Sequence, residues 1–447
     1  MTAFLPQPAV GEPGLWSFPA SQRSRLSNGI EVITFALPGQ QVISAHLVLD
    51  VPLNAESRDI EGVATLCSRV LDEGTLTHGG EEFPELLETE GAGFGVEVSL
   101  AGLQAVLDVP ASHLDRALEL FAEAVIQPAL ADTDVNRHVQ LRLAEIEQAE
   151  ANSAQVATIA FRETVFGPDS RASRMNGGQP ESVAQVTPEA VRRFHADHVG
   201  PTGATLILAG DFVSDPVVLA ENYLGGWTQP GQQHVAYAPP TTGQRRVFII
   251  DRPGAVQADV RFGGFGIDRV DPRWADISVA GYAMGGAFLS RLNAVLREDK
   301  GYTYGVRMNF APSRSGGSFA VQGSFRTDVV ADALRLTREL IDVGPQPFTV
   351  DEIADAVNFF AGVSPLRYAT ADGVADQAAI QVLNGLPDGY IDHSLDLLRA
   401  VTPTSATAAY ESLVHLDDLS LVVVGDAEAI AEPLRAVGFT DLEIVTR

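Results

Sequence analysis

The chain lacks several features that would narrow its function at once. Its 447 residues include a single cysteine, Cys67, so no intrachain disulfide can form, which agrees with a reducing compartment. No run approaches 18 uncharged apolar residues, which argues against a membrane-spanning helix. Residues 1–20 have neither a basic segment nor an apolar core, so they do not resemble a signal peptide, and their prolines and glycines predict an extended arm. We therefore expect a cytoplasmic protein.

Positive charge is also scarce. The chain carries 30 Lys and Arg against 58 Asp and Glu, a formal net charge of −28. A field of this sign repels nucleic acid and anionic lipid, so neither nucleic acid nor a membrane is expected as a partner, whereas basic peptides are attracted. Hydrophobic residues at 45% and charged residues at 20% describe a soluble globular protein. The length predicts two to four domains.

The sequence divides into two halves that carry the same order of signals. Residues 226–246 are rich in Pro, Gly and Gln and lack periodicity, which predicts a linker between domains at 21–225 and 247–447. Each half opens with two strands of alternating apolar residues and continues with amphipathic helices. Each closes with an apolar strand that ends in Gly-Asp, at Asp211 and at Asp426, 215 residues apart. We predict a duplicated α+β domain, each copy a mostly antiparallel sheet with helices packed on one face.

One segment, LREDKGYTYGV, places Arg297 and Tyr304 seven residues apart across a helix end, a turn and the start of a strand. Arginine offers a planar fork of donors and tyrosine a hydroxyl, so together they can hold a peptide carbonyl or stabilise an oxyanion. The alternative is structural: the arginine pairs with the last carbonyls of its own helix, and the tyrosine opens a strand. On spacing alone, the structural interpretation is favoured.

Several segments together resemble one known family. DRPGAVQADVRFG, MGGAFLSRL and LREDKGYTYG match, in this order, the C-terminal half of the pitrilysin/insulinase-type zinc metallopeptidases. FHADHVGPTGATLILAGDF matches the end of the family's N-terminal half. The resemblance covers nearly the whole chain and is strongest to the small two-domain subunits related to mitochondrial processing peptidase.

The chain departs from this family at the metal site. Active members carry the inverted motif His-x-x-Glu-His on the first long helix, with a further glutamate downstream. Here Thr65, Ser68 and Arg69 stand at the positions of the first histidine, the glutamate and the second histidine. Glu145, 76 residues beyond Arg69, resembles the distal ligand. A cation at Arg69 opposes zinc, so we expect no metal in this chain and either an ion pair between Arg69 and Glu145 or a solvent-facing glutamate.

The resemblance implies a role. In two-subunit members of the family, one subunit carries zinc and the other supplies an arginine–tyrosine pair. The chain is then expected to be a zinc-free subunit of a heterodimer, without hydrolase activity alone, whose Arg297 binds a substrate carbonyl and whose Tyr304 stabilises the tetrahedral intermediate at the partner's zinc. Gly285 and Gly286 resemble part of a substrate-contacting loop, or are helix-end glycines required for packing. The alternative function is a non-enzymatic scaffold or core-type subunit of a complex.

The remaining candidates have ordinary explanations. His195 and His198 lie three residues apart at a helix end, where they are expected to interact with the helix terminus, because no third ligand accompanies them. Cys67 is expected to be a small buried side chain, since no base for a catalytic thiol is evident.

Overall fold

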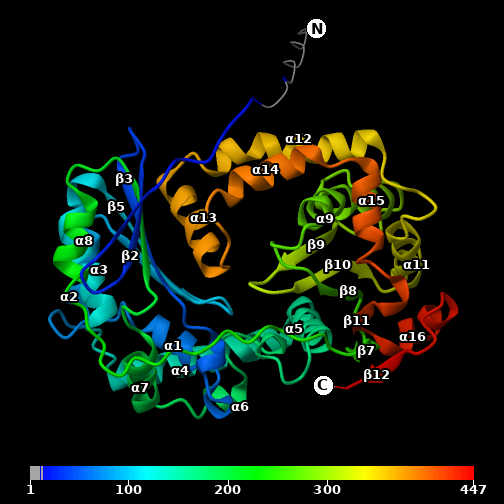
Figure 1. The fold of residues 1–447 in the computed structure, drawn as a ribbon. Helices are drawn as coiled ribbons and strands as arrows, with labels where there is room; N and C mark the ends of the chain where they lie inside the picture. Colours follow the sequence, from blue (N-terminus) through cyan, green and yellow to red (C-terminus); the bar gives the residue numbers. More distant parts are fainter. Residues whose placement is uncertain (1–10, 12–13, 447) are drawn as a thin grey trace, which may run out of the picture.

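The computed structural model describes residues 11 and 14–446 and contains two α+β halves, each built on a six-stranded sheet (Figure 1). Most of the predicted arm, residues 1–10 and 12–13, lies outside the described residues. No helix in the described part of the chain combines the length and the apolar composition that a membrane crossing requires.

The first half forms one sheet and the helices around it. In spatial order β1-β2-β6-β3-β5-β4, its strands are β1 (Gln22–Arg25), β2 (Glu31–Ala36), β6 (Thr205–Gly210), β3 (Val42–Leu49), β5 (Leu103–Pro110) and β4 (Gly93–Val98). Its helices are α1 (Val63–Arg69), α2 (Glu82–Thr89), α3 (Leu114–Ile126), α4 (Asp132–Ala151), α5 (Ser153–Val165), α6 (Pro180–Val183), α7 (Pro188–His198) and α8 (Pro216–Leu224).

The second half repeats this plan. In spatial order β12-β7-β11-β8-β10-β9, its strands are β12 (Glu443–Val445), β7 (Val247–Asp251), β11 (Ser420–Gly425), β8 (Gln257–Gly266), β10 (Gly317–Arg326) and β9 (Val306–Pro312). Its helices are α9 (Trp274–Gly281), α10 (Arg291–Asn293), α11 (Val330–Ile341), α12 (Val350–Arg367), α13 (Ala371–Leu383), α14 (Tyr390–Ala400), α15 (Pro403–Glu411) and α16 (Ala427–Ala436), with two π-helical segments, η5 (Tyr282–Gly286) and η6 (Ala294–Asp299).

The two sheets share their strand pairing. β2 runs parallel to β6 as β7 does to β11, and the next pairs, β6–β3, β3–β5 and β5–β4, are antiparallel like β11–β8, β8–β10 and β10–β9. The outer edge differs, because β1 is antiparallel to β2 whereas β12 is parallel to β7. The predicted duplicated α+β fold with mostly antiparallel sheets is therefore confirmed.

Each sheet packs one face against helices of its own half and the other face against a helix from the opposite half. α13 lies against β3 and β6, where small residues such as Ala375 and Ala379 meet Ile207. α5 lies against β8 and β11, where Ala157 and Ala160 belong to the same apolar cluster as Val422, Val424 and their neighbours. β6 and β11 are consequently buried on both faces, which explains their continuous apolar sequences.

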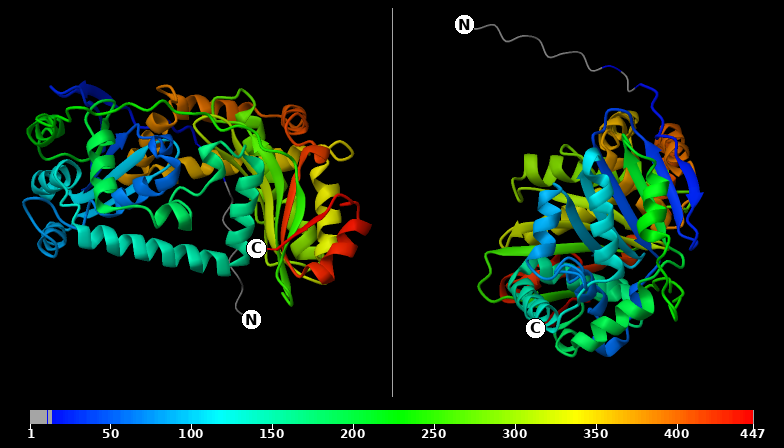
Figure 2. Two further views of the ribbon diagram at one scale, coloured as in Figure 1. Left: turned by 90° about the horizontal axis from the view of Figure 1, so that it is seen from below. Right: turned by 90° about the vertical axis from the view of Figure 1, so that its left-hand side faces the viewer.

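The views of the ribbon show how this exchange is built. α4 extends from the first half toward the second. It is followed directly by α5, which lies beside the second sheet (Figure 2, left). Along the opposite side, α12 and α14 run toward the first half, and α13 reaches the first sheet (Figure 1). Residues 226–246 contain no helix. Residues 241–243 lie beside the C-terminal end of α5, where the backbone N–H of Gly243 donates to the carbonyl of Val165 at 2.7 Å.

Candidate functional site

α1 and α4 bring together the residues that stand at the family's zinc-site positions by resemblance. The guanidinium of Arg69 on α1 donates to both carboxylate oxygens of Glu145 on α4, with Nη1–Oε1 at 2.8 Å and Nη2–Oε2 at 3.0 Å. This is the two-point geometry typical of arginine and carboxylate. The predicted ion pair between Arg69 and Glu145 is confirmed, and the Glu145 side chain within it remains partly exposed, at 43%.

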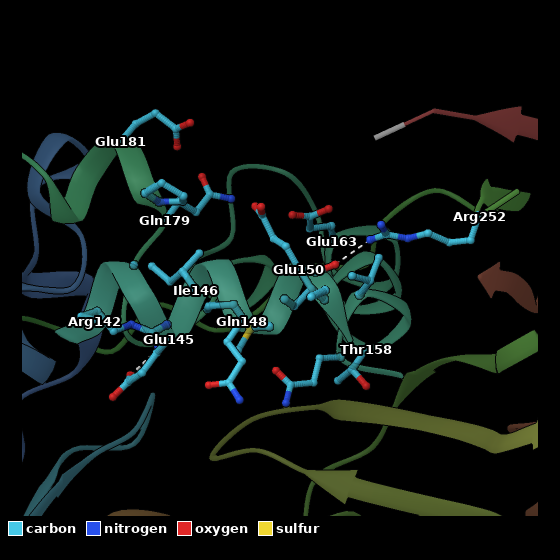
Figure 3. Close-up of a pocket in the computed structure, with 18 residues that line it drawn as sticks. Arg142, Glu145, Ile146, Gln148, Glu150, Thr158, Glu163, Gln179, Glu181 and Arg252 are labelled. Atoms are coloured by element: carbon cyan, nitrogen blue, oxygen red, sulfur yellow. Dashed lines mark hydrogen bonds and ion pairs between the residues drawn. The ribbon is translucent and has the colours of Figure 1, made fainter. Parts of the chain in front are cut away.

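A second arginine also engages Glu145. Arg142, one helical turn earlier on α4, donates from Nη1 to Glu145 Oε2 at 3.0 Å and from Nε to the carbonyl of Gly177 at 2.9 Å (Figure 3). The hydrogen bond from Arg69, together with Arg142, holds the pKa of the Glu145 carboxyl below its ordinary value. Glu145 is therefore ionised and committed to two guanidinium groups.

Thr65 and Ser68 are also engaged within the fold. Thr65 Oγ1 donates to the carbonyl of Asn176 at 3.3 Å, and Ser68 Oγ donates to the carbonyl of Thr65 at 2.8 Å. Within residues 11 and 14–446, no group of three or more His, Cys, Asp or Glu side chains is arranged to hold a metal. Two hydroxyls, a cation and a paired carboxylate do not make a zinc site, which needs neutral histidines or thiolates.

The N-terminus of α1 is held by a buried carboxylate that the sequence did not single out. Glu56, whose side chain is 0% exposed, accepts hydrogen bonds from the backbone N–H groups of Gly62 at 2.9 Å and Ala64 at 3.0 Å. It also accepts from Arg171 Nη2 at 2.8 Å. Burial raises the pKa of the Glu56 carboxyl, and the charge of Arg171 opposes that rise. Because 115 residues separate the two partners, no local pattern could have revealed this pair.

Arg297 and Tyr304 lie in the second half, at the surface. Tyr304 is 98% exposed, and its hydroxyl has no hydrogen-bond partner among the described residues. The Arg297 guanidinium carbon lies 4.0 Å from the ring centre of Phe288, which is itself 66% exposed, and Nε lies 3.5 Å from Glu298 Oε1. In the described residues, the Arg297 side chain makes no hydrogen bond to the carbonyls of its own helix, so the structural alternative does not explain this arginine.

The turn between the two residues is built by their neighbours. Gly301 adopts the left-handed conformation, with φ of 62°, and its N–H donates to the carbonyl of Arg297 at 3.0 Å. Tyr302 donates from its hydroxyl to Asp332 Oδ2 at 2.9 Å, so this tyrosine is tied into the fold. Tyr304, two residues on, has no such tie. Arg297 lies in the π-helical segment η6, and π-helical turns occur frequently at functional sites.

Gly285 has a packing role. A Cβ atom at this position would lie 2.4 Å from the backbone nitrogen of Met308 on β9, so only glycine allows η5 to approach the strand. Gly286 is less confined, because its nearest contact would be Tyr282 Cδ2 at 3.2 Å. Substrate contact by either glycine stays a prediction.

The other candidates are accounted for by the fold. His195 is buried and its Nε2 lies 2.8 Å from the carbonyl of Val125, while His198 packs against the ring of Phe194 at 4.9 Å. Cys67 is fully buried, as predicted, and burial raises the pKa of its thiol to about 12, so it is not a nucleophile.

Two cavities adjoin the degenerate metal site. The larger, of about 1120 Å³, lies along α4 and α5 and runs from Arg142 and Glu145 at one end to Arg252 at the other (Figure 3). The smaller, of about 620 Å³, lies between the two halves and is bordered by Asn176, whose carbonyl accepts from Thr65.

Comparison with known proteins matches two segments of the chain to one family. Residues 31–174 match the insulinase (peptidase family M16) domain, and residues 185–359 match the peptidase M16 inactive domain. An uncharacterised zinc protease of Streptomyces coelicolor is 25% identical over 426 residues, covering 92% of this chain and 91% of the relative. The non-peptidase homologue YmxG of Helicobacter pylori is 24% identical over 372 residues, covering 82% and 84%.

Solved structures share the fold. A peptidase M16 inactive domain from Pseudomonas fluorescens superimposes with a TM-score of 0.84 at 23% identity, covering 91% of this chain and 98% of that one. A chain of complex III2 from Candida albicans superimposes with a TM-score of 0.77 at 16% identity, covering 93% and 99%. Together, the two family matches, which span residues 31–174 and 185–359, show that the chain belongs to the peptidase M16 family.

Proposed function

We propose that the chain is the zinc-free subunit of a heterodimeric metallopeptidase whose homologous partner carries the zinc. The observation that supports this most strongly is a contrast within the molecule. Glu145 is engaged by ion pairs with Arg69 and Arg142, whereas the Tyr304 hydroxyl lacks a partner among the described residues. Arg297, seven residues earlier, lies over the exposed ring of Phe288.

In the proposed complex, the partner's zinc supplies the activated water. Arg297 binds a carbonyl of the substrate peptide, because its side chain is partly exposed, at 29%, and its guanidinium donates no hydrogen bond within the described residues. Tyr304 donates a hydrogen bond to the oxyanion of the tetrahedral intermediate, a contribution of about 3 kcal/mol to transition-state stabilisation. The net charge of −28 favours substrates with basic segments. We expect the complex in the cytoplasm.

A reconstituted heterodimer tests this function. The partner is sought as a homologue with an intact His-x-x-Glu-His motif encoded beside this chain, and a fluorogenic peptide reports cleavage. We expect Arg297→Ala and Tyr304→Phe each to lower kcat/KM by about 100-fold. Tyr302→Phe is the matched control for the tyrosine, and Arg435→Ala on α16 is the control for the arginine. Unchanged kcat/KM in both variants of the pair would refute the proposed role.

A non-enzymatic scaffold is the second candidate. The fold similarity to a chain of complex III2 from Candida albicans favours it, because a chain with this fold occurs there in a large assembly. In a scaffold, Arg297 and Tyr304 are relics. The chain then co-purifies with a stable assembly, no zinc-bearing homologue is encoded beside it, and neither variant changes any activity of the assembly.

A further inference from the structure

The smaller cavity, of about 620 Å³, is formed by both halves of the chain. Its walls are the turn between β4 and β5, the turn between β9 and β10, and the two exchanged helices α5 and α13. A cavity of this size lies within the range of small-ligand sites. Because the exchange of α5 and α13 fixes the two halves against each other, the cavity is part of the folded architecture.

One wall presents a cation without a carboxylate partner. Arg162 on α5 is mostly buried and donates from Nε to the carbonyl of Ala172 and from Nη2 to Asn176 Oδ1, the latter at 3.1 Å. Its Nη1 has no hydrogen-bond partner, and the guanidinium forms no ion pair, among the described residues. Burial, with the nearby charge of Arg171, lowers the pKa of Arg162 to about 10. A mostly buried, uncompensated charge is unfavourable unless something pairs with it.

Carboxylates on the other walls also lack ion pairs. Glu97, at the end of β4, and Asp376, on α13, line the same cavity, and neither forms an ion pair within the described part of the chain. The fourth charged side chain of the lining, Arg314, is already paired with Asp50 at 2.6 Å. The cavity therefore offers one unpaired cation and two unpaired anions from different elements.

The overall charge selects between ligands that these groups could bind. A dicarboxylate would suit Arg162, but it meets the repulsion of Glu97, Asp376 and a chain of net charge −28. A zwitterion carries no net charge and matches both signs. The hydroxyls of Ser313 and Ser318, which form no hydrogen bond within the described residues, supply hydrogen-bonding groups for a peptide backbone between its ends.

We propose that this cavity binds a short peptide with free termini, whose carboxylate meets Arg162 and whose ammonium group meets Asp376 and Glu97. The site goes beyond the proposed function, since it belongs to the chain alone and needs no partner subunit. A failure of Arg297 and Tyr304 to affect catalysis leaves this site intact, and absence of peptide binding here leaves their role intact.

Calorimetric titration of the isolated full chain with trialanine tests the proposal. We expect binding of the free peptide, and weakening by about tenfold when its carboxylate is amidated or its amine is acetylated. In Arg162→Met, amidation should make no further difference, whereas acetylation should still weaken binding. In the double variant Asp376→Asn, Glu97→Gln, acetylation should make no further difference, whereas amidation should still weaken binding. Arg252→Gln, in the larger cavity, is the control and should bind like the unaltered chain.

Chemical capping of the peptide keeps the test decisive even where a variant fails to fold, because it probes the unaltered protein. Thermal unfolding of each variant establishes whether its fold is intact. Equal affinity for free, amidated and acetylated trialanine, or no heat of binding at millimolar peptide, would overturn the proposal.

Discussion

The two halves of the chain share one sheet topology, but α1 in the first half and the segment before β9 in the second differ in how their polar side chains are paired. In the first half, α1 is fixed at its N-terminus by Glu56 and at its C-terminus by Arg69, and the side chains of Thr65 and Ser68 also bond within the fold. In the second half, the segment before β9 leaves Tyr304 98% exposed without a hydrogen-bond partner in the described residues. A group that the fold does not use is available to a ligand or another subunit, and this availability separates the segment before β9 from α1.

The largest expected effect comes from restoring the metal site in the first half. Thr65→His, Ser68→Glu and Arg69→His together supply two histidines and a base on α1 and release Glu145 from Arg69. We expect about one zinc per chain in the triple variant and none in the original, measured as metal content after dialysis. Thr65→His alone is the control and should bind none. A folded triple variant without zinc would show that α1 and α4 no longer have the spacing of the metal site.

The next effect is on stability. Glu56→Gln leaves the buried guanidinium of Arg171 without its main counter-charge, so we expect the free energy of unfolding to fall by about 3 kcal/mol. Urea denaturation at neutral pH measures the change, and Glu81→Gln, an exposed position, is the control. A loss below about 1 kcal/mol would mean that α1 is held mainly by apolar packing.

A smaller effect is expected from the ion pair between Arg69 and Glu145, because both side chains are partly exposed, at 32% and 43%. A double-mutant cycle with Arg69→Met and Glu145→Gln should give a coupling of about 0.5 kcal/mol. Since the folded-state pKa of Glu145 is lowered from 4.5, this contribution is present above pH 4.5 and disappears as the pH falls through the folded-state value. A coupling that does not weaken on acidification would contradict an ionic origin.

The sequence predicted the features that depend on local pattern or on a shared motif. Strand alternation and the Gly-Asp endings predicted the duplication, and the replacement of a histidine by Arg69 predicted an ion pair in place of a metal ligand set. The partner of Arg69, 76 residues away, was predicted only because Glu145 stands where the family has its distal ligand.

The features that the sequence did not predict depend on long-range packing. The alanine-rich faces of α5 and α13 show that they are buried, but not that each covers the sheet of the opposite half. Nor does the sequence assign Arg171 to Glu56 rather than to another carboxylate. The exposure of Tyr304 beside the tied Tyr302 also depends on tertiary structure, because the two tyrosines have nearly the same local sequence.

The central claim, that the second half delivers Arg297 and Tyr304 to a partner's zinc, has a direct geometric test. Lys300 is the only lysine in the sequence, lies between these two residues and is partly exposed, at 41%. A short amine-reactive crosslinker therefore joins this chain to a partner only through Lys300 or the N-terminus. In the assembled heterodimer, we predict crosslinks from Lys300 to the surface around the partner's His-x-x-Glu-His helix. A stable heterodimer in which Lys300 crosslinks only to surfaces remote from that helix would contradict the claim.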